Sequence, residues 1–127
     1  MTGVHVFVSF DLDHDNDCKG RLFDQVAAQG SHLAIDDWSI RPRAADWREK
    51  ATKRIANVDL LLVICGEHTD VATNVNIEIE LAREVGTPYF LLDGRPGDSA
   101  KPASARDRDR ILAWSPDALW PGLSPKH

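Results

Sequence analysis

Residues 59–92 read DLLLVICGEHTDVATNVNIEIELAREVGTPYFLL, and this stretch decides the fold. Residues 59–65 are apolar after the first position, and residues 88–92 form a second apolar run. Runs of this kind are typical of strands that are buried on both faces of a sheet. Residues 73–85 are predicted to form a helix that ends at Gly86, because glycine commonly follows the last helical turn. Strand, helix and strand at this spacing predict a βαβ unit with two parallel strands.

One charged side chain of the predicted helix is on an unexpected face. With about 100° between successive residues, Glu78 falls inside the apolar arc and Glu80 falls in the middle of the polar face. The arc is formed by Val75, Ile77, Ile79, Leu81, Ala82 and Val85. A carboxylate directed toward a sheet is unfavourable unless it is paired, protonated or next to a cleft. Two interpretations stay open from geometry alone: Glu78 is a functional carboxylate, or it reaches solvent at the wet end of its helix.

Length and composition restrict the class of protein. A chain of 127 residues suits one domain with a sizeable core, which we expect over residues 1–120, followed by a loose tail at 121–127. The net charge of −5 argues against nucleic-acid binding, which needs a basic patch. No apolar run approaches the roughly 18 residues of a membrane span, and no signal peptide is visible. Cys18 and Cys65 are then typical of reduced thiols, so we expect a cytoplasmic protein.

The remaining chain alternates strand and helix patterns. Strands are predicted at residues 4–10, 32–37 and 111–114, and helices at 17–29 and 47–57. Together with the central unit, they predict a flavodoxin-like α/β fold. Such a fold is a doubly wound parallel sheet, here of about five strands, with helices on both faces.

Ligands bind such sheets in the crevice beyond the carboxyl ends of the strands. At these ends the chain carries aromatic, acidic and imidazole side chains. Four of them are candidates for substrate binding: Phe10, Asp11, Trp38 and His68. Glu78 belongs to the same rim if its helix begins near Thr73, because it then lies within about two turns of the strand ends.

Motifs for other ligands are incomplete. Asp11, Asp13 and Asp15 have the spacing of an EF-hand, but Asn16 and Leu22 stand where that motif requires glycine and glutamate. Neither the dinucleotide-binding glycine motif nor the P-loop occurs. The sequence therefore predicts no metal site and no nucleotide-binding fingerprint.

Five segments of the chain resemble one family. They are VFVSFDLDHDND, IDDWSI, ADWREKATKRI, LLVICGEHTDVAT and PYFLLDGR. Together they are similar to the TIR-like domain family of the bacterial Thoeris anti-phage defence system, over about residues 6–114. The ICGEHT block is the most specific segment, whereas the Phe-x-Ser-Phe-Asp opening is shared more widely among TIR-like proteins. The family's flavodoxin-like fold agrees with the fold predicted from the residues.

The resemblance implies an NAD+ glycohydrolase or ADP-ribosyl cyclase-like enzyme, with NAD+ as its substrate and no separate cofactor. Such enzymes cleave the bond between nicotinamide and ribose. Thoeris members make a signal from the product, a cyclic ADP-ribose isomer or an ADP-ribose conjugate, which activates a separate effector, ThsA. The family's catalytic glutamate lies early in the helix after the ICGEHT strand, which implies that Glu78 is catalytic. A carboxylate suits this reaction because the loss of nicotinamide leaves a ribosyl cation.

Two interpretations from other classes stay open. One is a non-enzymatic TIR-like module that only assembles with partners, which predicts no nicotinamide release under any trigger. The other is a flavodoxin-like regulator, which predicts nucleotide binding without turnover. The product isomer, a phage-derived trigger and assembly into a homo-oligomer are also open at this point.

Overall fold

The computed structural model describes residues 4–29, 33–38, 46–95, 97–105, 109 and 111–112. The described elements, in chain order, are β1 (Val4–Ser9), α1 (Asn16–Gln29), β2 (Leu33–Trp38), α2 (Trp47–Ala56), β3 (Leu60–Cys65), the 3-10 helix η1 (Thr69–Val71), α3 (Thr73–Val85), β4 (Tyr89–Asp93) and β5 (Ile111–Leu112). Across these residues the strands form one five-stranded sheet in the order β2-β1-β3-β4-β5, and every pair is parallel. This arrangement confirms the predicted flavodoxin-like α/β fold.

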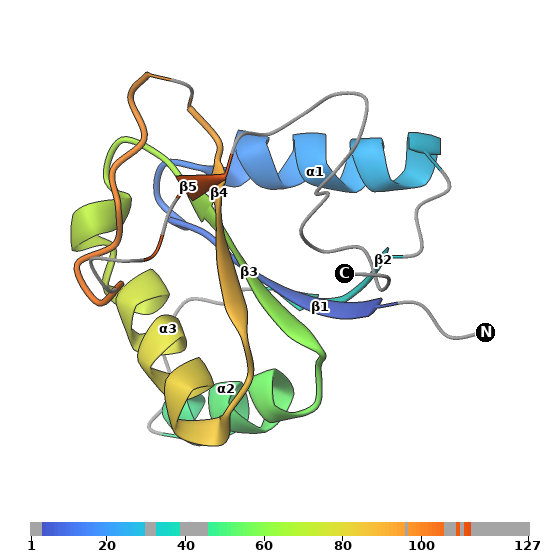
Figure 1. Cartoon of the computed structure of the whole chain (residues 1–127), viewed down its shortest axis with the longest axis vertical. Coiled ribbons are helices and arrows are strands. Elements are labelled where there is room, and N and C mark those ends of the chain that lie inside the picture. The colour runs from blue at the N-terminus through green and yellow to red at the C-terminus, as the bar shows by residue number, and fades with distance from the viewer. Residues whose placement is uncertain are drawn as a thin grey trace.

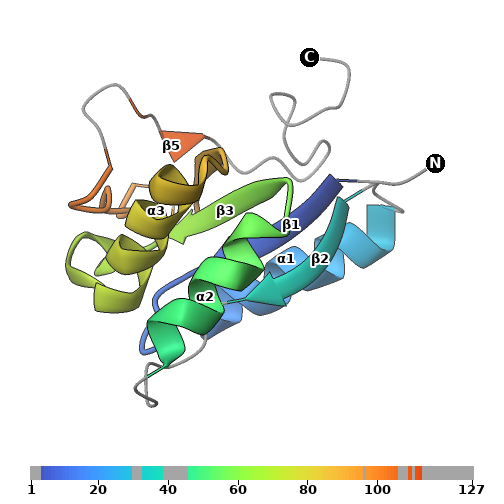
Figure 2. The same cartoon turned by 90° about the horizontal axis from the view of Figure 1, so that it is seen from below.

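Helices cover both faces of the sheet. α1 lies on one face, and α2 and α3 lie on the other (Figure 1, Figure 2). β3 is in the middle, and all six of its residues are buried. Alternate residues of β3 therefore enter two separate cores: Leu60, Leu62 and Ile64 pack with the α1 side, and Leu61, Val63 and Cys65 pack with α2 and α3. Burial on both faces explains why this strand is a continuous apolar run.

α3 begins and ends where the sequence predicts. It spans Thr73–Val85 and is followed by Gly86, which has a φ of 82° and donates its N–H to the carbonyl of Ala82. This left-handed conformation has little cost only for glycine. Val85 is 37% exposed, so the apolar face is narrower at the end of the helix than the helical wheel predicts.

Other differences from the predicted elements are small. β2 ends at Trp38, one residue beyond the strand predicted at 32–37, and β5 covers only Ile111–Leu112. The rest of the strand predicted at 111–114 and the expected tail at 121–127 lie outside the described residues. Among the described helices, none combines the length and the apolar character that crossing a membrane requires.

The chain after β4 folds back over the end of β3. The backbone N–H groups of Gly94 and Ala100 donate to the carbonyls of Cys65 and Gly66, at 2.9 and 2.8 Å. A Cβ atom on Gly94 would lie 2.7 Å from Ile64 Cγ2 and 2.9 Å from the Cys65 carbonyl, so only glycine fits there without a shift. This close approach fixes the carboxyl edge of β3 and β4, next to the candidate site.

Candidate functional site

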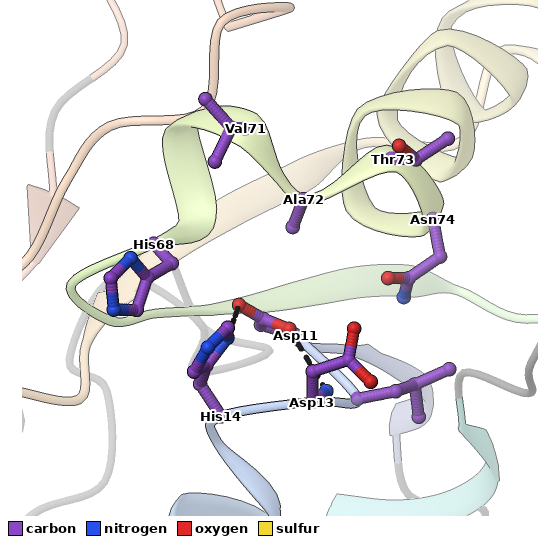
Figure 3. A pocket seen from close by; sticks show the side chains of 9 residues that line it. Asp11, Asp13, His14, His68, Val71, Ala72, Thr73 and Asn74 are labelled. Atoms are coloured by element: carbon purple, nitrogen blue, oxygen red, sulfur yellow. Dashed lines mark hydrogen bonds and ion pairs between the residues drawn. The ribbon is translucent and has the colours of Figure 1, made fainter.

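A cleft of about 250 Å³ opens at the carboxyl edge of the sheet, between the loop that follows β1 and the segment that joins β3 to α3 (Figure 3). Its lining residues are Asp11, Leu12, Asp13, His14, His68, Val71, Ala72, Thr73 and Asn74. β1 and β3 are neighbours in the sheet, but α1 and α3 lie on opposite faces. The cleft therefore occupies the topological switch point, where open α/β sheets bind their ligands.

Asp11 organises the acidic loop after β1. One carboxylate oxygen accepts the backbone N–H of Asp13 at 2.9 Å, and the other lies 2.8 Å from His14 Nδ1. The Asp11 backbone carbonyl also accepts the N–H of Asp15 at 2.9 Å. The hydrogen bond to the Asp11 carboxylate is the main cause that raises the pKa of His14. Asp11 therefore shapes the loop and places an imidazole at the mouth of the cleft.

Two histidines stand side by side at this mouth. The ring centroids of His14 and His68 are 4.2 Å apart, and the planes are tilted by 38°. Both rings also line a second cavity of about 220 Å³, together with Asp15, Glu67 and Arg95. The histidine pair is thus a shared wall between two adjacent cavities.

Arg95 lines the second cavity and contacts two aspartates there. Its guanidinium pairs with both carboxylate oxygens of Asp17, at 2.7 and 2.9 Å, and lies 3.4 Å from the buried Asp15 carboxylate. These contacts lower the pKa of Asp17. Burial raises the pKa of Asp15, and Arg95 partly offsets that effect.

Glu78 is a buried residue of α3 and follows the cleft lining by one helical turn. Its side chain is 0% exposed, and its Oε1 accepts a hydrogen bond of 2.7 Å from the Ser9 hydroxyl at the end of β1. Asn74 is one helical turn earlier on α3 and lines the cleft, and its amide donates to the carbonyl of Phe10 at 2.9 Å. Asn74 and Glu78 therefore share one face of α3, and Asn74 is the one of the two that lines the cleft.

The structure separates the four residues that the sequence grouped as substrate-binding candidates. Asp11 and His68 both line the cleft. The Phe10 ring is 1% exposed and packs in the core on the α1 side, so its ring is not part of the cleft wall. The physical reason is strand alternation, which directs Phe10 to the face opposite Ser9. Trp38 ends β2, and its side chain lies outside the described part of the structure.

Three site residues were not selected from the sequence: Ser9, His14 and Asn74. Two of them had a recognisable signal. Ser9 is the polar residue within the apolar strand that precedes the rim, and Asn74 is four positions before Glu78, so it shares the same face of the helix.

Within the described residues, one group brings three donors of metal-binding type together: Asp15, Asp17 and Cys18. These residues fit a metal ion poorly, because Arg95 already pairs with both carboxylates. Burial also raises the pKa of the Cys18 thiol, which disfavours the thiolate that binds metals. Burial raises the pKa of Cys65 to about 12, so this cysteine is unsuited to act as a nucleophile.

Comparison with known protein families identifies a match that covers more than half of the chain. Residues 7–93 match the family described as Thoeris protein ThsB, TIR-like domain. No curated protein matches the chain. The matched residues extend from β1 to the end of β4, so they contain Ser9, the described lining of the cleft and Glu78. The chain therefore belongs to the TIR-like domain family of the Thoeris protein ThsB.

Proposed function

We propose that this chain is an NAD+-cleaving enzyme of bacterial anti-phage defence, which releases nicotinamide and makes an ADP-ribose-derived signal for the effector ThsA. Membership of the Thoeris family supports the role in defence alongside ThsA. The observation that carries the enzymatic part is the position of Glu78. A buried carboxylate lies on α3 one turn after Asn74, which lines the cleft at the switch point of the sheet, and a hydroxyl donor fixes it.

The proposed reaction needs a negative charge near the ribose. The bond between C1′ of the ribose and the nicotinamide nitrogen breaks, and its electron pair leaves with nicotinamide, which becomes neutral. Positive charge develops on the ribose as an oxocarbenium ion, which a carboxylate in a low-dielectric site stabilises strongly. Water, or a nucleophilic atom of the same ADP-ribose, then adds to C1′ and releases a proton. The first route gives ADP-ribose and the second gives a cyclic product.

The charge of the cleft supports nicotinamide as the group that it binds. Among the residues that the structure describes, the lining includes the carboxylates of Asp11 and Asp13 and neither a lysine nor an arginine. A pyridinium ring carries one positive charge, so it suits the nearby carboxylates of Asp11 and Asp13. The negatively charged diphosphate then lies away from the acidic loop.

Access to Glu78 requires a small rearrangement. We expect the Asn74 side chain, which lines the cleft, to turn away from the Phe10 carbonyl when a ribose approaches the carboxylate. Breaking one hydrogen bond between neutral groups costs about 1 kcal/mol net. The binding energy of a dinucleotide exceeds this cost several-fold, since even a micromolar complex is worth about 8 kcal/mol.

The experiment that tests this function measures small molecules in cells that express the chain and ThsA and are challenged with several phages. We expect mass spectrometry to detect free nicotinamide and an ADP-ribose-derived product, and the small-molecule fraction to activate ThsA in vitro. Unchanged nucleotide pools, in cells that still resist a phage, would support a non-enzymatic TIR-like module instead. Binding of NAD+ to the purified chain without turnover under any challenge would support a nucleotide-binding regulator.

A further inference from the structure

Ser9 is the point at which the central sheet touches the Glu78 carboxylate. It is the last residue of β1, its side chain is 0% exposed, and its hydroxyl donates to Glu78 Oε1 at 2.7 Å across 69 residues of sequence. Its neighbours Val8 and Phe10 enter the core on the α1 side, whereas Phe7 enters the core with α3. Strand alternation therefore directs Ser9 toward α3.

A second contact fixes the same helix to the same strand end. Asn74 donates to the carbonyl of Phe10, which is the residue after Ser9, and Asn74 is one turn before Glu78. Two adjacent residues at the end of β1 thus bind two side chains one turn apart on α3. The Asn74 contact holds the backbone at the start of the helix, and the Ser9 contact holds the carboxylate itself.

We infer that Ser9 is a positioning residue for Glu78, which orients the carboxylate and favours its ionised form; this role rests on the proposed cleavage of NAD+. A glutamate has three rotatable side-chain bonds, and a catalytic group must be held within about 0.5 Å of its productive position. A hydroxyl that donates to a carboxylate makes a charge-assisted hydrogen bond, which fixes one oxygen. The same bond stabilises the negative charge that the developing ribosyl cation requires.

Steady-state kinetics of Ser9→Ala test this role. We expect kcat to fall about ten- to one-hundred-fold, the scale for losing a hydrogen bond to a charged group. We expect KM for NAD+ to stay close to wild type, because Ser9 is buried and does not line the cleft. The acid limb of the pH–rate profile should move to higher pH, since the ionised carboxylate has lost a donor. Ser9→Thr keeps the hydroxyl and should restore most of kcat.

Thr87→Val is the matched control. The Thr87 hydroxyl is buried and donates to the Ile55 carbonyl at 2.9 Å, before the amino end of β4 and far from Glu78 in the fold. Its loss should lower the free energy of unfolding in urea by about 1 kcal/mol, because one buried hydrogen bond between neutral groups is removed. It should leave kcat and the pH profile unchanged, so a purely structural effect is separated from positioning.

A measurement that needs no turnover completes the test. Carbon-13 NMR of the Glu78 carboxyl carbon follows its titration in the resting protein, and the midpoint should move to higher pH in Ser9→Ala but not in Thr87→Val. If Ser9→Ala does not fold, Ser9→Cys takes its place, because a thiol is a much weaker donor of similar size. An unchanged titration midpoint of Glu78 in Ser9→Ala would overturn the positioning role alone. The same conclusion would follow if Ser9→Ala kept the wild-type kcat and pH profile while Glu78→Gln was inactive. Full activity of Glu78→Gln would overturn the proposed mechanism and the role of Ser9 with it.

Discussion

Replacing Asn74 by alanine should expose Glu78 to the cleft. The Asn74 side chain lines the cleft and donates a buried hydrogen bond of 2.9 Å to the Phe10 carbonyl, and Glu78 lies one turn behind it with no exposed surface. Such a bond contributes about 1 kcal/mol net, which corresponds to about a five-fold change in a population. Conformations in which the floor of the cleft is open should therefore be about five-fold more populated in the variant.

Carbodiimide labelling of carboxylates, followed by fragmentation mass spectrometry, measures this opening. The rate at which Glu78 is labelled should rise about five-fold in Asn74→Ala. Glu80 is exposed two residues away, so it is labelled in the same peptide and serves as an internal reference whose rate should not change.

Asn76→Ala provides a control on the same helix. The Asn76 amide donates to the carbonyls of Asp70 and Ala72, and its carbonyl oxygen accepts the Ser104 N–H at 2.8 Å, so the variant loses more hydrogen bonds than Asn74→Ala. None of these contacts involves Glu78. An unchanged labelling rate in Asn74→Ala would refute the reasoning. An equal rise in both variants would refute it too, because the opening would then be global rather than local.

Two further predictions concern the loop after β1 and the edge of the sheet. The pKa of His14 is raised above 6.5 by its hydrogen bond to Asp11, so proton NMR should show a high titration midpoint that Asp11→Asn returns toward 6.5. Because the pKa is higher in the folded state, the stabilisation is fully present below about pH 6.5 and is lost as the pH rises through the folded value. Gly94→Ala should lower the free energy of unfolding by about 1–3 kcal/mol in urea, because its Cβ meets Ile64 and the Cys65 carbonyl. Gly20→Ala, in open space on α1, should be neutral or stabilising by about 0.5–1 kcal/mol, and a loss similar to that of Gly94→Ala would contradict this account.

The sequence predicts the central βαβ unit well because its signals are local. The run up to Cys65 is apolar at every position since both faces of β3 are buried, and Gly86 ends α3 because the chain there takes a positive φ. The helical wheel of α3 also places Glu78 on the buried side. This placement depends only on the angle between successive residues of a helix.

The contacts of the site are harder to predict because they join distant segments. Ser9 and Glu78 are 69 residues apart, and Asn74 reaches Phe10 across 64. Period-two alternation in β1 indicates that adjacent residues point to opposite faces, but the apolar pattern VFVSF does not indicate which face meets which helix. For this reason Phe10 was expected in the cleft, and Ser9, which points toward α3, was not.

Nicotinamide release by Glu78→Gln and Glu80→Gln tests the central claim most directly. The two side chains project about 200° apart on α3, and Glu78 is buried whereas Glu80 is exposed. Under conditions in which the wild-type chain cleaves NAD+, we predict that Glu78→Gln lowers the rate by roughly 10²-fold or more. It should keep an unchanged circular dichroism spectrum, and Glu80→Gln should match wild type. An active Glu78→Gln protein, or an inactive Glu80→Gln protein beside it, would contradict the assignment of the carboxylate that stabilises the ribosyl cation.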